Sequence, residues 1–157
     1  MNNGDSHKEI HFTWTDAWLL QAIAMAARKQ PATIEKIIAA GDAIMHAVFT
    51  FEEFGLGLAK LTTGGYVAEE AGKFQLSPHF SSAFMRLARQ ARSWREVNET
   101  LLAFLVREYG KVDAATKQQP GPSLSLADFE EAVIHYIHPT PTLTRLMNLF
   151  KRLRNQN

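Results

Sequence analysis

Three side chains late in the chain have the types and the spacing of metal ligands. Glu131, His135 and His138 are separated by four and three residues, so a helix would present them on one face. Carboxylate and imidazole groups at this spacing can hold a metal ion. No other ligand cluster supports such a site, and a histidine at a helix end before Pro139 also complements the helix dipole. We therefore expect no metal.

Arginine recurs at every third position beyond residue 85. The four residues are Arg86, Arg89, Arg92 and Arg95. A stripe of guanidinium groups could contact phosphates or an acidic partner. The alternative is a solvated face whose charges pair with Glu96, Glu99 and neighbouring acids, and charge stripes are more often of this kind.

A second basic cluster lies near the C-terminus and contains no acid. Its members are Arg145, Lys151, Arg152 and Arg154. They could grip nucleic acid or an anionic surface, but basic residues near the C-terminal end of a helix also complement its dipole. We favour the second interpretation.

The composition and the motifs exclude several kinds of chemistry. The 157 residues include no cysteine, so disulfides, thiolate metal sites and cysteine nucleophiles are ruled out. The sequence has no nucleophile elbow, no glycine-rich phosphate loop and no supported pair of carboxylates. We expect neither an enzyme nor a bound cofactor.

Hydropathy indicates a soluble protein, and the charge is unevenly distributed. No signal peptide is evident, and the longest apolar run, residues 17–27, is too short to span a bilayer. A cytoplasmic protein without membrane contact is expected. Residues 1–80 carry six basic and nine acidic residues, a net charge of −3, whereas residues 81–157 carry eleven and seven, a net charge of +4. The N-terminal half therefore lacks the positive charge that supplies most nucleic-acid affinity.

The apolar pattern predicts two helices at the start of the chain. Residues 16–28, capped by Thr15, are apolar around most of the helix circumference, which is typical of a helix buried on more than one side. Such a helix occupies either a central position or an oligomer interface. A second helix, residues 34–40, follows Thr33 and ends at Gly41, unless the apolar pattern beyond the glycine continues it for another turn or two.

The next segment predicts a helix, a tight turn and a two-stranded ribbon. Thr50 and Glu53 form a capping box, and apolar residues at helical spacing follow until a glycine pair ends the helix. Those apolar residues are Phe51, Phe54, Leu58 and Leu61. Short strands at residues 66–67 and 74–76 then flank a glycine-containing turn at residues 69–72.

Helices are predicted for most of the remaining chain. One follows Pro78, and two more, at residues 94–109 and 126–137, each begin after a serine cap. Residues 110–123 have the composition of an exposed loop. A last amphipathic helix is expected at residues 143–154, with its apolar side inward.

The order helix, helix, helix and hairpin resembles bacterial winged helix-turn-helix regulators of the multiple-antibiotic-resistance and phenolic-acid-regulator kinds. The resemblance rests on Leu58-x-x-Leu61-x-x-x-Gly65-Tyr66-Val67 and on Phe74-Gln75-Leu76-Ser77, where the recognition helix turns into the wing, and it covers about residues 14–80. It implies a homodimer that binds two-fold related half-sites of double-stranded DNA. Trp14-Thr15-Asp16-Ala17 and residues 41–47 also resemble small bacterial winged-helix proteins of uncharacterised function, which implies no mechanism.

The predicted outer face of the third helix is a poor DNA-reading surface. With the apolar set inward, the outward residues are Glu52, Glu53, Leu56, Lys60 and Thr63. DNA-reading helices usually present Arg, Lys, Asn, Gln or Ser at such positions, and the wing adds Glu69 and Glu70 against Lys73. An exposed Leu56 suits contact with another protein.

Glycines flank this leucine on both sides. Each glycine in a helix interior costs about 0.5–1 kcal/mol relative to alanine, so Gly55 and Gly57 indicate a close backbone approach. The approaching element is either a partner or the first helix, whose crowding the glycines would relieve. The sequence leaves both alternatives open.

We interpret the chain as a mainly α protein with a small β-hairpin wing. A winged helix-turn-helix domain is expected at residues 12–78 and a helical C-terminal extension at residues 79–157. Residues 16–28 and the extension would form the dimer interface.

Two functions are compatible with this fold. The first is a DNA-binding transcriptional regulator, which rests on analogy of fold. Its DNA contacts would be Lys60, Thr63, Lys73, Arg86 and Arg89. The alternative is an interaction module that keeps the fold, does not bind DNA and contacts a protein partner through Glu52, Glu53 and Leu56.

Overall fold

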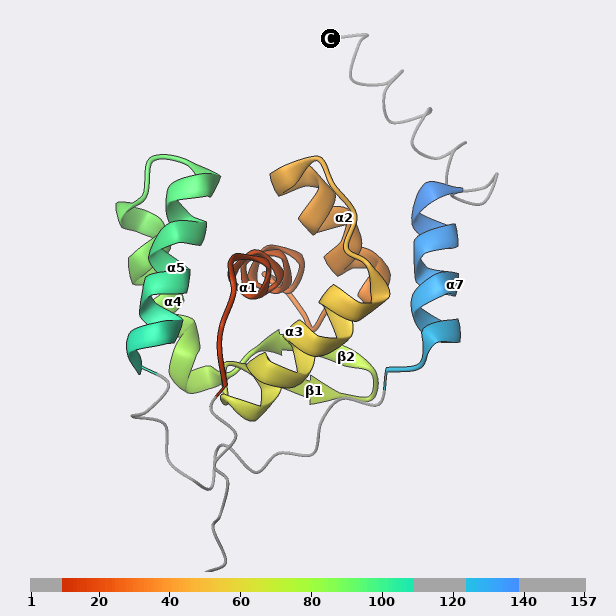
Figure 1. Ribbon diagram of the computed structural model, residues 1–157, viewed down its shortest axis with the longest axis horizontal. Helices are drawn as coiled ribbons and strands as arrows, with labels where there is room; N and C mark the ends of the chain where they lie inside the picture. The colour runs from red at the N-terminus through yellow and green to blue at the C-terminus, as the bar shows by residue number, and fades with distance from the viewer. Residues whose placement is uncertain (1–9, 109–123, 139–157) are drawn as a thin grey trace, which may run out of the picture.

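The computed structural model describes residues 10–108 and 124–138, which are mainly helical and contain one two-stranded antiparallel sheet (Figure 1). The helices are α1 (Trp14–Ala26), α2 (Ile34–Met45), α3 (Phe51–Thr63), α4 (Pro78–Gln90), α5 (Trp94–Glu108) and α7 (Leu126–Ile137). The strands are β1 (Val67–Glu70) and β2 (Lys73–Leu76). None of these helices has both the length and the apolar character that crossing a membrane requires.

Helix α1 is the central element, and Figure 1 shows it nearly end-on in the middle of the molecule. Residues 16–24 are all buried, because α2 and α3 contact this helix on one side and α5 contacts it on the other. The apolar circumference of this helix predicted either a central position or an oligomer interface, and the central position is confirmed. Its burial needs no second copy of the chain, and the predicted dimer interface stays a prediction.

The start of α1 differs from the prediction by two residues. Thr13, and not Thr15, is the cap, since Thr13 Oγ1 accepts a hydrogen bond from the backbone of Asp16 and the Asp16 carboxylate accepts one from the Thr13 amide at 2.6 Å. Both threonines precede an acidic residue in the sequence, and only the three-residue spacing completes a reciprocal capping box.

Helix α2 continues past Gly41 and ends at His46, whose φ of 55° is left-handed. Gly41 is a packing residue. Its carbonyl accepts a hydrogen bond from Trp18 Nε1 at 3.1 Å, and a β-carbon at this position would lie 2.4 Å from the ring of Phe49. The longer form of this helix is thus confirmed, and the predicted stop at the glycine is wrong because the glycine serves a helix-to-ring contact.

Helix α3 matches its prediction closely. The Thr50 amide donates to the Glu53 carboxylate at 2.9 Å, and the Glu53 amide donates to Thr50 Oγ1 at 3.2 Å, so the capping box is confirmed. The helix ends before Gly64, and Gly65 adopts a φ of 76° that a side chain would resist.

The hairpin strands are longer than expected. Register pairs Glu69 with Phe74 and Glu70 with Lys73, so the two glutamates belong to the strand. The turn then consists of two residues, Ala71 and Gly72, with φ values of 50° and 71°. Positive φ at both positions is the geometry of the tightest hairpin turns.

A third segment joins the sheet at a single residue. Ala32, between α1 and α2, exchanges two backbone hydrogen bonds of 2.8 Å with Phe74. This pairing ties the connection between the first two helices to the hairpin.

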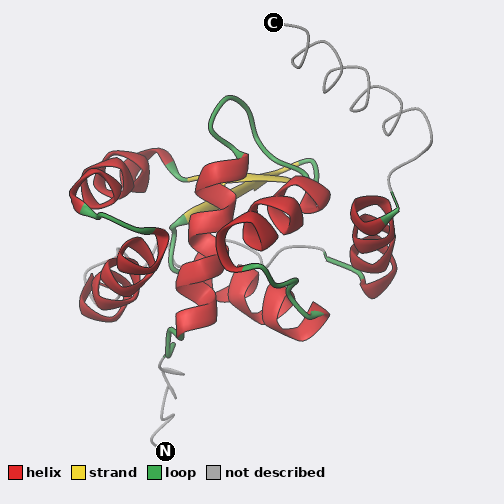
Figure 2. Ribbon diagram, turned by 90° about the horizontal axis from the view of Figure 1, so that it is seen from above, coloured by secondary structure: helices red, strands yellow, loops and turns green. Residues whose placement is uncertain are grey.

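Helices α4 and α5 lie on the opposite side of α1 from α2 and α7, as Figures 1 and 2 show. The predicted break between them is confirmed, since Ser93 Oγ accepts a hydrogen bond from the Glu96 amide. Helix α5 adds buried residues to the core. Two amides also link it to α1: Asn98 donates to the Trp14 carbonyl at 3.2 Å, and Gln21 donates to the Trp94 carbonyl at 3.3 Å. The extension therefore completes the core around α1.

Helix α7 has the predicted bounds and packs on α2 and α3. Phe129 is buried with its ring 5.3 Å from that of Phe54, and Tyr136 donates a hydrogen bond to the Asp42 carboxylate. The expected loop at 110–123, the expected helix at 143–154 and its basic cluster lie outside the described residues.

Candidate functional site

The outer face of α3 is acidic and apolar, as predicted. Glu52 and Glu53 are exposed at the N-terminal end of the helix, and Leu56 follows with 59% of its surface exposed. Glu53 also caps the helix through Thr50. Its carboxylate is therefore held in place, whereas Glu52 and Leu56 make no such local contact.

The predicted outward position of Lys60 is wrong. Its ammonium group reaches back to α1, where it forms an ion pair with the Asp16 carboxylate and donates to the His11 carbonyl at 3.2 Å. The side chain of Lys60 is 25% exposed and that of Asp16 is 3% exposed. A buried carboxylate requires a counter-charge, and the flexible lysine stem can supply one from the edge of the helix.

Sequence analysis does not find Asp16 as a functional neighbour of α3, because a first-turn aspartate is also typical of any helix N-terminus. Its carboxylate accepts hydrogen bonds from both Thr13 groups as well as from Lys60. An aspartate three residues after a threonine, with a lysine on a helix that packs nearby, is a weak signal for such an arrangement. Only the crossing of α1 and α3 brings the two charges together.

The two glycines of α3 have different surroundings. A β-carbon at Gly57 would lie 2.9 Å from Leu19 Cδ2 and 3.1 Å from Asp16 Oδ1, whereas a β-carbon at Gly55 would meet nothing within 4 Å. The relief of crowding against the first helix is thus confirmed for Gly57. Gly55 lies beside open space next to Leu56.

The wing does not reverse the charge of this surface. Glu70 and Lys73 are exposed and Glu69 is half-buried. Lys73 forms no ion pair within residues 10–108 and 124–138, so it is free to contact a ligand. Thr63, at the end of α3, is half-buried. The α3 and wing surface therefore presents several carboxylates and a single unpaired ammonium group among the predicted contacts.

The arginine stripe divides into paired and unpaired members. Arg95 Nε contacts Glu99 at 3.0 Å, and Glu96 accepts a hydrogen bond from the backbone of Arg92. The guanidinium groups of Arg86, Arg89 and Arg92 are exposed and make no ion pair with any described residue. The interpretation of the stripe as a solvated face whose charges pair with neighbouring acids thus holds for Arg95 alone.

The predicted DNA contacts do not form one surface. Lys73 adjoins the hairpin turn, and Gly72 of that turn lines a groove together with residues of α2 and α7. Arg86 and Arg89 lie on α4, which packs with α5 on the other side of α1. Lys60 is engaged by α1. The wing and the arginines are close in the sequence, but they lie on different sides of the folded chain.

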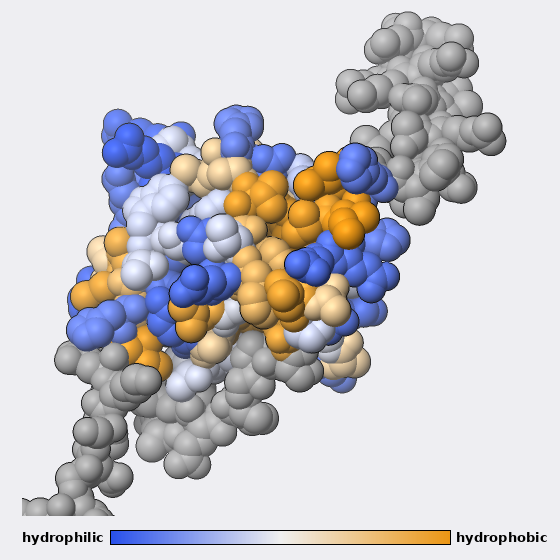
Figure 3. Space-filling view, turned by 45° about the vertical axis from the view of Figure 1, so that its right-hand side comes forward, coloured by the Kyte–Doolittle hydropathy of each residue, from blue (hydrophilic) through white to orange (hydrophobic). Residues whose placement is uncertain are grey.

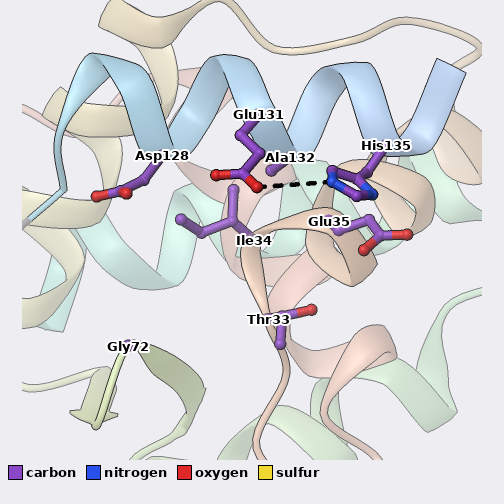
Figure 4. A pocket seen from close by; sticks show the side chains of 8 residues that line it. All are labelled: Thr33, Ile34, Glu35, Gly72, Asp128, Glu131, Ala132 and His135. Carbon is purple, nitrogen blue, oxygen red and sulfur yellow. Dashed lines mark ion pairs between the residues drawn. The ribbon is translucent and has the colours of Figure 1, made fainter. Parts of the chain in front are cut away.

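A shallow acidic groove of about 390 Å³ lies between the start of α2, the hairpin turn and α7 (Figure 4). Its lining residues are Thr33, Ile34, Glu35, Gly72, Asp128, Glu131, Ala132 and His135. Glu131 and His135 are 3.6 Å apart across one turn of α7, so the predicted shared face of these two is confirmed. His138 follows the end of α7 as its cap residue. No group of three potential ligands within the described part of the chain is arranged to hold a metal ion.

Comparison with known proteins identifies no family for this chain. No protein-family model matches it, and neither the curated proteins nor the solved structures give a match. The resemblance to winged-helix regulators consequently remains a prediction from the sequence.

Proposed function

We propose that residues 12–78 form a winged helix-turn-helix that serves as a protein-interaction module. The order of α1, α2, α3 and the hairpin supports this fold. The pairing of Ala32 with Phe74 ties the connection between α1 and α2 to this hairpin, which supports one unit of helices and wing. Fold alone does not define an activity, so the function rests on the outer surface.

The observation that carries the proposal is the environment of Lys60. It is the only basic residue on α3, and the buried Asp16 neutralises it. The free outer face then consists of Glu52, the capping Glu53 and the exposed side chain of Leu56. Carboxylates repel DNA phosphates, whereas an exposed leucine beside acids suits a partner with an apolar pocket and a basic rim.

The experiment compares capture of a partner by two lysine substitutions of equally exposed apolar residues. Leu56→Lys changes the proposed surface, and Val106→Lys changes an exposed residue of α5, where 64% of the side chain is open. A protein that wild type retains should be identified by mass spectrometry, lost with Leu56→Lys and kept with Val106→Lys. Retention of the same protein by both variants would contradict the proposal.

A second function, DNA binding, is favoured by one observation. Residues 78–95 contain four arginines and no acidic residue, and the guanidinium groups of Arg86, Arg89 and Arg92 form no ion pair among the described residues. Such a surface would contact the phosphate backbone without reading bases. A homodimer would double the number of these contacts.

Titration with mixed-sequence duplex separates the two functions. The interaction module should bind no duplex even at about 50 mM salt. Phosphate contacts would instead give micromolar affinity that falls steeply towards about 200 mM salt, and Arg86→Glu with Arg89→Glu would abolish it. The matched control is Lys73→Glu, which changes the charge of the wing and should leave arginine-mediated binding in place.

A further inference from the structure

Helix α7 has an apolar side that its packing leaves uncovered. Its inward residues, Phe129 and Tyr136, contact α3 and α2. Beside them Leu126, Ile134 and Ile137 are 49%, 58% and 55% exposed. Figure 3 shows apolar side chains gathered over α7 and the neighbouring helices. We call these three residues the α7 stripe.

The α7 stripe runs along one side of the helix, with Glu130 between Leu126 and Ile134. At 100° per residue its three members fall within an arc of about 80°. The acidic groove lies on the other flank of the helix, where Glu131 and His135 project. Glu130 falls inside the arc of the stripe, is exposed and forms no ion pair in the described ranges. An occupant of the stripe therefore needs apolar side chains and a basic residue.

We propose that residues 143–154 of the same chain cover the α7 stripe as the second helix of an antiparallel helical hairpin. Apolar residues recur in this segment at the spacing of one helix face: Leu143, Leu146, Met147, Phe150 and Leu153. The segment has twelve residues, as does α7. Residues 139–142, Pro-Thr-Pro-Thr, match the short connections of antiparallel helix pairs, and proline stops the preceding helix.

Charge complementarity supports the same occupant. Residues 143–154 contain four basic residues and no acid, whereas the arc of the α7 stripe contains the exposed Glu130. In an antiparallel pair joined by this connection, Lys151 and Arg154 lie opposite the N-terminal half of α7, where Glu130 falls within the arc of the stripe. Lys151 and Arg154 of the C-terminal basic cluster thus pair with the acidic residue of the stripe, a role other than binding nucleic acid.

Disulfide trapping in the full chain tests the proposal directly. Because the chain has no cysteine, a pair of introduced cysteines can form only one intramolecular bond. Ile134→Cys with Leu146→Cys joins the two facing apolar sides, and the matched control, Ile134→Cys with Arg145→Cys, moves the second thiol away from that side. A disulfide needs α-carbons within about 7 Å, so we expect the first pair to form a cross-linked monomer at least about tenfold faster than the control.

The outcomes on a non-reducing gel are distinct. A cross-linked monomer specific to the first pair supports the proposal. A cross-linked dimer would show that the segment of a second copy occupies the stripe, and equal rates for both pairs would show that no docking exists. Either result overturns the proposal.

Limited trypsin digestion gives a second, thiol-free measurement. Docking protects the bond after Arg145, so Ile134→Asp should speed its cleavage by about tenfold relative to wild type. The same substitution at Val106, which is also exposed, should leave the cleavage rate unchanged. An unchanged rate in Ile134→Asp would overturn the proposal.

Discussion

The same substitution at two nearby glycines of α3 should change stability in opposite directions. Gly55→Ala places a methyl group where nothing lies within 4 Å. The change keeps only the benefit of alanine over glycine in a helix interior, about 0.5–1 kcal/mol. We therefore expect Gly55→Ala to raise the free energy of unfolding by about that amount.

Gly57→Ala has the same helix benefit and an additional cost. Its methyl group would lie 2.9 Å from Leu19 Cδ2 and 3.1 Å from Asp16 Oδ1. Leu19 is fully buried and Asp16 is bound by Thr13 and Lys60, so neither neighbour can move away freely. Overpacking of this kind costs about 1–3 kcal/mol, which outweighs the helix term. The net change should be a loss of up to about 2 kcal/mol.

Urea unfolding followed by circular dichroism at 25 °C measures both changes. With a slope of about 1–3 kcal/mol per molar urea, the Gly55→Ala midpoint should rise by a few tenths of a molar and the Gly57→Ala midpoint should fall. A rise of similar size in both variants would refute the tight contact between α1 and α3. A fall in both would refute the open space at Gly55.

Three further changes test the charges and the turn. Replacing Lys60 with alanine removes the partner of the buried Asp16 and should cost about 1–3 kcal/mol in the free energy of unfolding, measured with urea. Ala71→Gly removes a side chain from a residue with φ of 50° and should stabilise by about 0.5–1 kcal/mol, measured as a rise in Tm. The hydrogen bond to Asp42, with burial and the negative charge of that carboxylate, raises the pKa of Tyr136 above its usual 10.0. The folded state then holds this proton more tightly than the unfolded state does. The resulting contribution to the free energy of unfolding is complete below about pH 10 and is lost as pH rises through the raised pKa. Urea unfolding midpoints measured across this pH range would report the loss.

Each of these changes has a matched control. Lys73→Ala removes an exposed and unpaired ammonium group and should change stability by less than about 0.5 kcal/mol. Ala71→Val places a branched side chain at the same positive φ and should destabilise the hairpin. Tyr136→Phe should remove the alkaline loss assigned to this tyrosine. Equal effects of substitution and control in any pair would contradict the corresponding argument.

The sequence predicted elements whose signals are local. Three such signals each act within one turn of the chain: the capping box of Thr50 and Glu53, the serine before α7 and the glycine after α3. All three were located correctly. The predicted stop at Gly41 failed because a glycine can serve a turn or a close contact. The ring of Phe49, which makes the contact here, lies beyond the local window.

The surface was harder to predict than the fold. Helical periodicity correctly placed Glu52 and Leu56 outward, since rotation about one axis decides that. The direction of Lys60 depends on a carboxylate buried on another helix, and the separation of Arg86 from Lys73 depends on the packing of α4 against α5. Such features require the crossing of elements, which no pattern within one segment specifies.

The link between α1 and α5 also affects the order in which the chain can fold. The Trp14 carbonyl meets the side chain of Asn98, 84 positions later, and α5 covers one side of α1, whose residues 16–24 are all buried in the folded chain. A ribosome that has released only the first 80 residues therefore leaves this side of α1 in water. Because contacts of such long sequence separation form late, the nascent N-terminal half should remain open to chaperones until α5 emerges and closes over α1.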